Sequence, residues 1–189
     1  GSGEEYGKIK HASKEILREE SCTPYAFSKT AATHFLQMLN RSENFPAVIL
    51  RPFLVYGNNQ NENKLIPYII DKCLKNENIL LTGGNQVRDF IHTNDVNSAV
   101  LKLIEKGDFN GIYNIGIENP INILELAKYI IKSVGKGKIK FIKDRPFNDT
   151  RYNVNFDKLK KLGWSPKNNF YEQLDEIIEW EKNNTIKKQ

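Results

Sequence analysis

Apolar and polar positions follow a helical period in the first third of the chain and then change to a strand-like run. Over residues 23–41, Phe27, Ala31 and Phe35 recur every four positions, which predicts one apolar face of a helix. Thr23 suits the cap of this helix and Pro24 suits its first turn. Residues 47–57 begin with a continuous apolar stretch, which predicts a strand covered on both faces in a parallel sheet.

The rest of the chain continues this alternation of helices and strands. We predict helices over 64–77, 95–107, 122–135, 155–164 and 170–183. For the helix over 95–107, Asn94 or Asp95 is the expected N-cap and Gly107 the expected end. We predict strands over 79–83, 87–93, 111–117 and 138–143. Strands that alternate with helices indicate an α/β fold with a mostly parallel sheet.

Composition narrows the class of protein. The 189 residues are 39% hydrophobic and 11% aromatic, which suits a folded chain of one domain or of two modest parts. No apolar run approaches a membrane span, and residues 8–20 are too charged for a secretory signal. Cys22 and Cys73 fit neither a disulfide framework nor a metal spacing, so we expect thiols in a reducing, cytoplasmic setting.

Charge favours an anionic ligand without pointing to nucleic acid. The chain carries 28 basic and 23 acidic residues, a net charge of +5. The basic residues are spread, and no motif interleaves them with aromatic side chains, so a nucleic-acid binder is the weakest alternative. The histidines lack the spacing of metal ligands, and we expect no metal site: His11, His34 and His92.

Tyr25 and Lys29 are the first candidates for chemistry. Residues four apart share one face of a helix, so the two side chains are expected to lie together. A nearby ammonium favours the phenolate form of a tyrosine, which then exchanges protons with a hydroxyl or carbonyl group. Ser2, in the upstream segment "GSGEEYG", is able to hydrogen-bond the same reacting oxygen. On the residues alone, however, such a pair is also an ordinary feature of a helix surface.

Several segments together resemble the extended short-chain dehydrogenase/reductase family, the NAD-dependent nucleotide-sugar epimerases and dehydratases. They come in the family's order over nearly the whole chain. The segments are "GSGEEYG", "PYAFSK", "LRPFLVYG", "KLIPYII", "GNQVRDFIHTNDV", "YNIG" and "LGWSP".

The resemblance implies a function and a set of roles. Tyr25 is the expected acid–base residue, Lys29 favours its phenolate and binds the ribose of NAD or NADP, and Ser2 orients the sugar oxygen. Hydride exchange with the cofactor takes place at C4 of the sugar. Residues expected to bind the nucleotide-diphosphate sugar are Lys64, Leu65, Arg88 and Arg145. The arginines suit phosphate oxygens, although Asp89 and Asp144 beside them allow plain surface ion pairs instead.

Two departures from the family pattern affect the expected reaction. Leu54 stands where the family carries an asparagine that contacts substrate, which leaves the substrate pose open. Glu4 matches a glutamate that serves as a base in dehydratases, but Gly3 stands where one dehydratase group has an acid. Gly3 therefore favours an epimerase or a 4-keto-sugar reductase over a 4,6-dehydratase, which stays as the alternative.

The third departure concerns the cofactor domain. The family's strand and Gly-rich loop, which cradle the cofactor pyrophosphate, have no counterpart in these residues. The resemblance thus implies the C-terminal part of a Rossmann-type domain over 1–57 and a smaller α/β substrate domain over 58–189. Strand 111–117 is expected to return to the cofactor-domain sheet.

Such a chain leaves apolar sheet and helix surfaces uncovered, so we expect self-association or a homo-oligomer. A non-catalytic fragment, or a module that only binds nucleotide sugar, remains the alternative of another class.

Overall fold

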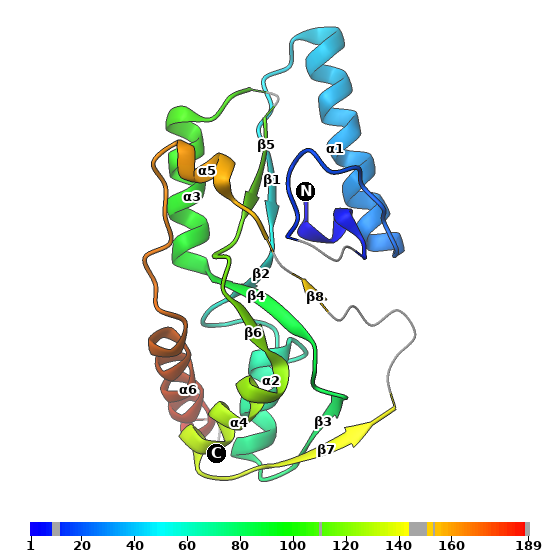
Figure 1. The fold of residues 1–189 in the computed structure, drawn as a ribbon. Coiled ribbons are helices and arrows are strands. Elements are labelled where there is room, and N and C mark those ends of the chain that lie inside the picture. The colour runs from blue at the N-terminus through cyan, green and yellow to red at the C-terminus, as the bar shows by residue number, and fades with distance from the viewer. Residues whose placement is uncertain (9–11, 110, 144–150, 153, 188–189) are drawn as a thin grey trace.

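Two clusters of buried apolar side chains divide the molecule into an upper and a lower part (Figure 1). The computed structural model describes residues 1–8, 12–109, 111–143, 151–152 and 154–187. The upper part contains η1 (Gly3–Tyr6), α1 (Pro24–Glu43), β1 (Ile49–Pro52), α3 (Thr93–Lys106), β5 (Ile112–Ile115) and α5 (Asp157–Lys161). The lower part contains α2 (Leu65–Leu74), β3 (Asn78–Thr82), α4 (Ile123–Val134), β7 (Lys138–Ile142) and α6 (Phe170–Lys187).

Strands β2 (Leu54–Tyr56) and β4 (Val87–His92) connect the two parts. Successive side chains of a strand point to opposite faces, so neighbouring residues of β4 pack into the two different clusters. Phe90 belongs to the lower cluster and Ile91 to the upper one. Full burial of one such side chain stabilises the fold by about 1.5–3 kcal/mol, so β4 ties the two parts together.

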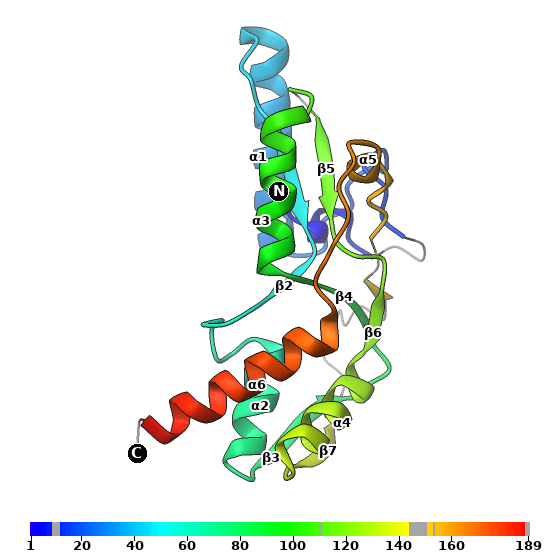
Figure 2. The same cartoon turned by 90° about the vertical axis from the view of Figure 1, so that its left-hand side faces the viewer.

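The layers follow from which face each helix buries. Helices α1 and α3 lie on opposite sides of β1 and β5 (Figure 1). In the lower part α6 runs across α2 and α4 (Figure 2). The buried face of α4 carries Ile123, Leu126, Ala127 and Ile130, a helical spacing that matches the predicted periodicity.

The strand pairing is mostly parallel, as the sequence predicted. The pairs β1–β5, β2–β4 and β3–β7 are parallel, and so is β4 with the short β8 (Arg151–Tyr152). The pair of β4 with β6 (Pro120–Asn122) is antiparallel, and β6 was not predicted. Residues 112–115 align with 49–52, so β5 joins the strand from the first 57 residues. The domain boundary at residue 57 stays a prediction.

The predicted single strand over 47–55 is wrong, because the chain changes sheets at Phe53. Strand β1 pairs with β5, whereas β2 pairs with β4. Pro52 has no backbone N–H to extend a ladder. Phe53 donates its own N–H to Ile115 at 3.0 Å and turns its ring into the upper cluster. Beyond that point the chain leaves β5 and runs beside β4.

The predicted cap of the helix over 95–107 is also wrong. His92 is the N-cap of α3, and its ring accepts the N–H of Asn94 at 3.4 Å. Asp95 is buried, and its carboxylate accepts the N–H groups of Lys167 at 2.9 Å and of Asn168 at 3.3 Å. Its side chain therefore anchors the segment before α6 instead of capping its own helix.

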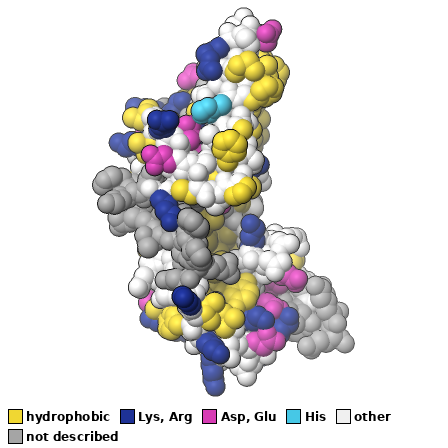
Figure 3. All heavy atoms as spheres, turned by 90° about the vertical axis from the view of Figure 1, so that its right-hand side faces the viewer, with side chains coloured by type: hydrophobic (Ala, Val, Ile, Leu, Met, Phe, Trp, Pro, Cys, Tyr) yellow, Lys and Arg dark blue, Asp and Glu magenta, His cyan; other side chains and the backbone are white. Residues whose placement is uncertain are grey.

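The apolar stripe predicted on α1 is largely exposed. Phe27 is 67% exposed and Phe35 56%, whereas Ala26 and Thr33 form the buried side of the helix. Apolar side chains accordingly appear along the upper part of the face shown in Figure 3. No helix among the described residues is both long and apolar enough to cross a membrane.

Candidate active site

The start of α1 presents Tyr25 and Lys29 on one face. Thr23 caps the helix by accepting the N–H of Ala26 at 3.1 Å, and Pro24 occupies the first turn, both as predicted. The Tyr25 side chain is half-exposed, and the Lys29 ammonium lies 5.4 Å from the centre of its ring. This geometry places a cation beside a phenol that remains accessible to a ligand.

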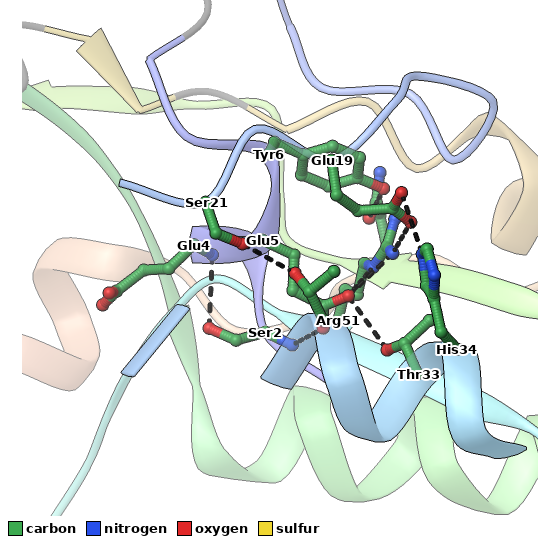
Figure 4. A network of polar contacts seen from close by, with 11 residues as sticks. Ser2, Glu4, Glu5, Tyr6, Glu19, Ser21, Thr33, His34 and Arg51 are labelled. Atoms are coloured by element: carbon green, nitrogen blue, oxygen red, sulfur yellow. Dashed lines mark hydrogen bonds and ion pairs between the residues drawn. The ribbon is translucent and has the colours of Figure 1, made fainter. Parts of the chain in front are cut away.

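Ser2 and Glu4 reach the same region from the short helix η1. Ser2 is the N-cap of η1, and its hydroxyl oxygen accepts the N–H of Glu4 at 3.2 Å. Because that hydroxyl acts as an acceptor in the cap, its own proton is available to a ligand oxygen. The Glu4 side chain points away from the polar network behind it (Figure 4).

One cavity brings Ser2, Glu4 and Tyr25 together, whereas Lys29 does not line it. It has a volume of about 320 Å³ and is lined by Ser2, Glu4, Tyr25, Lys64 and Leu65 among others. A further part of its wall comes from residues 52–56, around the point where the chain changes sheets. The segment that was predicted to be one strand is broken at Phe53, and the residues around this break form part of the cavity wall.

A second cavity continues the first toward the lower part. It has a volume of about 640 Å³ and contains Arg88. Leu54 and Leu65 line both cavities, so the two adjoin, and we refer to them together as the cleft. Thr82 and Gln86, which sequence reasoning did not identify, also line the Arg88 end. Arg145 lies outside the described residues.

Asp89, next to Arg88, is directed into the fold. Its carboxylate accepts the N–H of Ile117 at 2.9 Å and of Asn119 at 3.2 Å. Burial raises the pKa of this carboxyl to about 6, although the backbone donors oppose the shift. Through its bonds to Ile117 and Asn119, Asp89 holds the turn after β5 in place. The neighbouring Arg88 donates from its guanidinium to the carbonyl of Val87 at 3.0 Å.

Asp89 should carry a pH-dependent part of the folding free energy. Because the folded pKa lies above the unfolded value of 3.8, the folded protein binds this proton more tightly. The contribution is complete below pH ~4 and is lost as the pH rises through ~6, by a free energy on the order of 3 kcal/mol. We expect Asp89→Asn to remove this slope in urea unfolding measured across that interval. If the difference in unfolding free energy between wild type and variant stays constant with pH, the raised pKa assigned to Asp89 is contradicted.

Behind the cleft lies a buried ion pair that the sequence did not reveal. Glu5 and Arg51 are both fully buried, with Glu5 Oε2 at 2.7 Å from Arg51 Nη2 and 3.0 Å from Nε (Figure 4). The other Glu5 oxygen accepts the backbone N–H of Ser2 at 2.7 Å. Thr33, on the buried side of α1, donates its hydroxyl to Glu5 Oε2 at 2.9 Å.

Further contacts hold Arg51 from its other sides. Its guanidinium carbon lies 4.6 Å from the centre of the Tyr6 ring, and Nη2 donates to Glu19, which also contacts the exposed His34. Burial raises the pKa of the Tyr6 hydroxyl to about 12, against the opposing effect of Arg51. Tyr6 therefore stays protonated and donates to the side-chain oxygen of Asn114 at 2.8 Å.

Within the described part of the chain, no group of three or more His, Cys, Asp or Glu residues is arranged to hold a metal ion.

The strand pairing and the helices define an α/β protein of Rossmann type, and Tyr25 lines its cleft. Residues 1–116 match the sequence pattern of the NAD dependent epimerase/dehydratase family, and the chain belongs to that family. This agrees with the predicted fold class and family.

Similar proteins share both sequence and structure with this chain. A dTDP-D-glucose 4,6-dehydratase of Bos taurus is 34% identical over 187 residues, which is 94% of this chain and 53% of the relative. The crystal structure of the Bacillus anthracis dTDP-glucose 4,6-dehydratase in complex with NAD has a TM-score of 0.91 and 31% identity, covering 97% of this chain and 60% of that one.

A UDP-N-acetylglucosamine 4-epimerase of Methanobrevibacter ruminantium has a TM-score of 0.89 and 28% identity, with 97% of this chain and 61% of that one covered. The chain thus spans about half the length of the curated relative described above. The similarity extends to dehydratases and epimerases alike.

Proposed function

We propose that the protein is an NAD(P)-dependent nucleotide-sugar enzyme that exchanges hydride at C4 of the sugar. The observation that carries the proposal is the single cleft containing Ser2, Glu4 and Tyr25 together with Lys64 and Leu65. Arg88 lines the adjoining cavity. A sugar beside Tyr25 and a diphosphate toward Arg88 fit the order of groups in a nucleotide-diphosphate sugar.

The cofactor fits the chemistry of the tyrosine end. Lys29 is an ammonium donor beside a half-exposed phenol, and such a donor suits the hydroxyls of a ribose. Tyr25 and Lys29 are therefore the residues of this chain that would contact bound NAD or NADP. When bound, the cofactor accepts and returns the hydride.

The proton is handled by the chain itself. As the C4 hydroxyl is oxidised, its carbon–hydrogen electron pair leaves as hydride and its oxygen loses a proton to the phenolate of Tyr25. The C4–O bond becomes a carbonyl, and Ser2 donates a hydrogen bond to that oxygen. In the reverse direction Tyr25 returns the proton.

Arg88 is proposed to bind the diphosphate. Lys64 stands at the N-terminus of α2 without a side-chain cap bond, and Leu65 begins the helix, so the positive end of its dipole also faces the cleft. Leu65 contributes apolar contact to this part of the ligand. Arg145 is a further candidate, on the resemblance alone.

Arg88→Ala should weaken binding of UDP or dTDP by about 10–100-fold, since a charge-assisted hydrogen bond contributes about 1.5–3 kcal/mol. Isothermal titration measures the effect, with Arg41→Ala on the exposed end of α1 as the matched control. Equal affinity in the two variants would place the diphosphate elsewhere.

The leading reaction is epimerisation or reduction of a 4-keto sugar. Gly3 is buried and offers no side chain beside Glu4, so the proton donor that loss of water from C6 requires is lacking at this position. The second candidate is 4,6-dehydration, supported by Glu4 in the cleft and by the dehydratases among the relatives. Proton NMR of the product separates them, because only dehydration creates a 6-methyl group.

Self-association through the exposed face of α1 is a further part of the proposal. Phe27, Phe35 and Met38 are exposed apolar side chains on that helix.

A non-catalytic module remains the alternative of another class. Titration of NAD into the protein discriminates between the proposed enzyme and such a module, because a module that only binds nucleotide sugar would not take up cofactor.

A further inference from the structure

The carboxylate of Glu5 joins three separate elements at one buried point. One oxygen accepts the backbone N–H of Ser2 at 2.7 Å. The other accepts the hydroxyl of Thr33 at 2.9 Å and two guanidinium N–H groups of Arg51 at 2.7 and 3.0 Å. Ser2 precedes η1, Thr33 lies on α1 and Arg51 on β1. A single side chain therefore fixes the catalytic segment against a helix and a strand.

Helix α1, which contacts Glu5 through Thr33, also carries Tyr25. Thr33 lies eight residues after Tyr25 on α1, which is about 12 Å along the axis. Because an α-helix is rigid over two turns, fixing Thr33 relative to Ser2 also fixes Tyr25 relative to Ser2. The hydroxyl of Ser2 is oriented separately, by accepting the N–H of Glu4 at 3.2 Å.

The environment leaves Glu5 little freedom to move. Both Glu5 and Arg51 have fully buried side chains, so neither charge has water as a substitute partner. The ring of Tyr6 covers the guanidinium at 4.6 Å, and Glu19 binds it from the solvent side. A buried charge without its partner is strongly unfavourable, and this cost restricts Glu5 to the geometry that holds Ser2.

We propose that Glu5, braced by Arg51, is a positioning residue that sets the Ser2 hydroxyl relative to the Tyr25 phenol. The inference rests on the proposed function, because it assigns Ser2 and Tyr25 to one sugar oxygen. Glu5 does not touch the substrate. It acts through the Ser2 backbone, and so it affects the reacting geometry more than the binding of the nucleotide.

A double-mutant cycle in the intact native protein with NAD and a nucleotide sugar tests this role. We expect Glu5→Gln to lower kcat by about 10–100-fold, since a small misplacement of a reacting group has effects of this size, with little change in KM. In a Ser2→Ala background the same substitution should have almost no further effect, because its target is gone. Effects that multiply in the double variant would overturn the positioning role.

Two further variants keep the test decisive. Glu19→Gln is the matched control, because it removes the other carboxylate from Arg51 without touching Ser2, and it should leave kcat near the wild-type value. If Glu5→Gln does not fold, Thr33→Val removes one bond to the same carboxylate without changing charge. It should also lower kcat selectively, and an unchanged kcat would overturn the proposal.

A measurement without turnover separates this inference from the proposed function. Hydrogen exchange of the Ser2 amide, followed by NMR on protein labelled with ¹⁵N-serine, reports its bond to Glu5 directly. Exchange should accelerate at least tenfold in Glu5→Gln and stay unchanged in Glu19→Gln. If the wild type fails to turn over nucleotide sugars, the proposed function fails and exchange alone decides. Equal exchange in wild type and Glu5→Gln would overturn the positioning role.

Discussion

Replacement of Tyr25 by phenylalanine should lower kcat by about 10²–10⁴-fold, the usual range for loss of a general acid–base group. The substitution removes only the hydroxyl and leaves the ring beside Lys29 in place. Because Tyr25 is half-exposed at the start of α1, the fold should not depend on that hydroxyl. Steady-state assays of turnover and a thermal unfolding scan measure the two effects separately.

Tyr171→Phe is the matched control for this variant. Tyr171 is a similarly exposed tyrosine on α6, and it does not line the cleft. We expect its kcat and its melting temperature to match the wild type. Retention of more than half of the activity in Tyr25→Phe would show that another group carries the proton.

Arg51→Met should destabilise the protein by about 3–5 kcal/mol, the usual cost of leaving one charge of a buried pair without its partner. The variant strands the Glu5 carboxylate, which is fully buried. A typical domain is stable by only 5–15 kcal/mol, so the effect is a large share of the total. Urea unfolding at neutral pH measures it.

The double variant Glu5→Leu/Arg51→Met distinguishes a stranded charge from lost packing. Removing both charges should restore much of the stability, because no buried ion is left unpaired. Lys128→Met breaks the exposed pair with Glu125 and serves as the surface control, with an expected change of about 0–1 kcal/mol. A double variant as unstable as Arg51→Met would contradict this explanation.

Local signals in the sequence placed the α-helices, although the predicted cap of α3 was wrong and η1 was not predicted. Thr23 and Pro24 marked the start of α1, and Asn122 and Gly135 flank α4 as a cap and a terminator should. The break at Phe53 was not predictable in the same way. Residues on both sides of it are apolar and strand-forming, and the break depends on β5 and β4, which come much later in the chain.

The cleft was predicted more completely than the structure that supports it. Ser2, Glu4, Tyr25, Lys64 and Leu65 were predicted from motifs and line one cavity. Their catalytic and binding roles stay predictions.

The sequence offered no pattern that predicts the buried Glu5–Arg51 ion pair behind the cleft. Glu4 and Glu5 are adjacent and identical in type, and only the turn of η1 decides which faces the cleft and which is buried. The partners that fix Glu5 lie 28 and 46 positions away in sequence.

The most direct test of the account is product analysis by proton NMR after incubation of the intact native protein with NAD and UDP- or dTDP-linked hexoses. We expect a product altered at C4, either a 4-keto sugar or the C4 epimer, and no such product with Tyr25→Phe. Nucleotide sugar that binds and is recovered unchanged at C4, in the presence of bound NAD, would contradict the proposed chemistry.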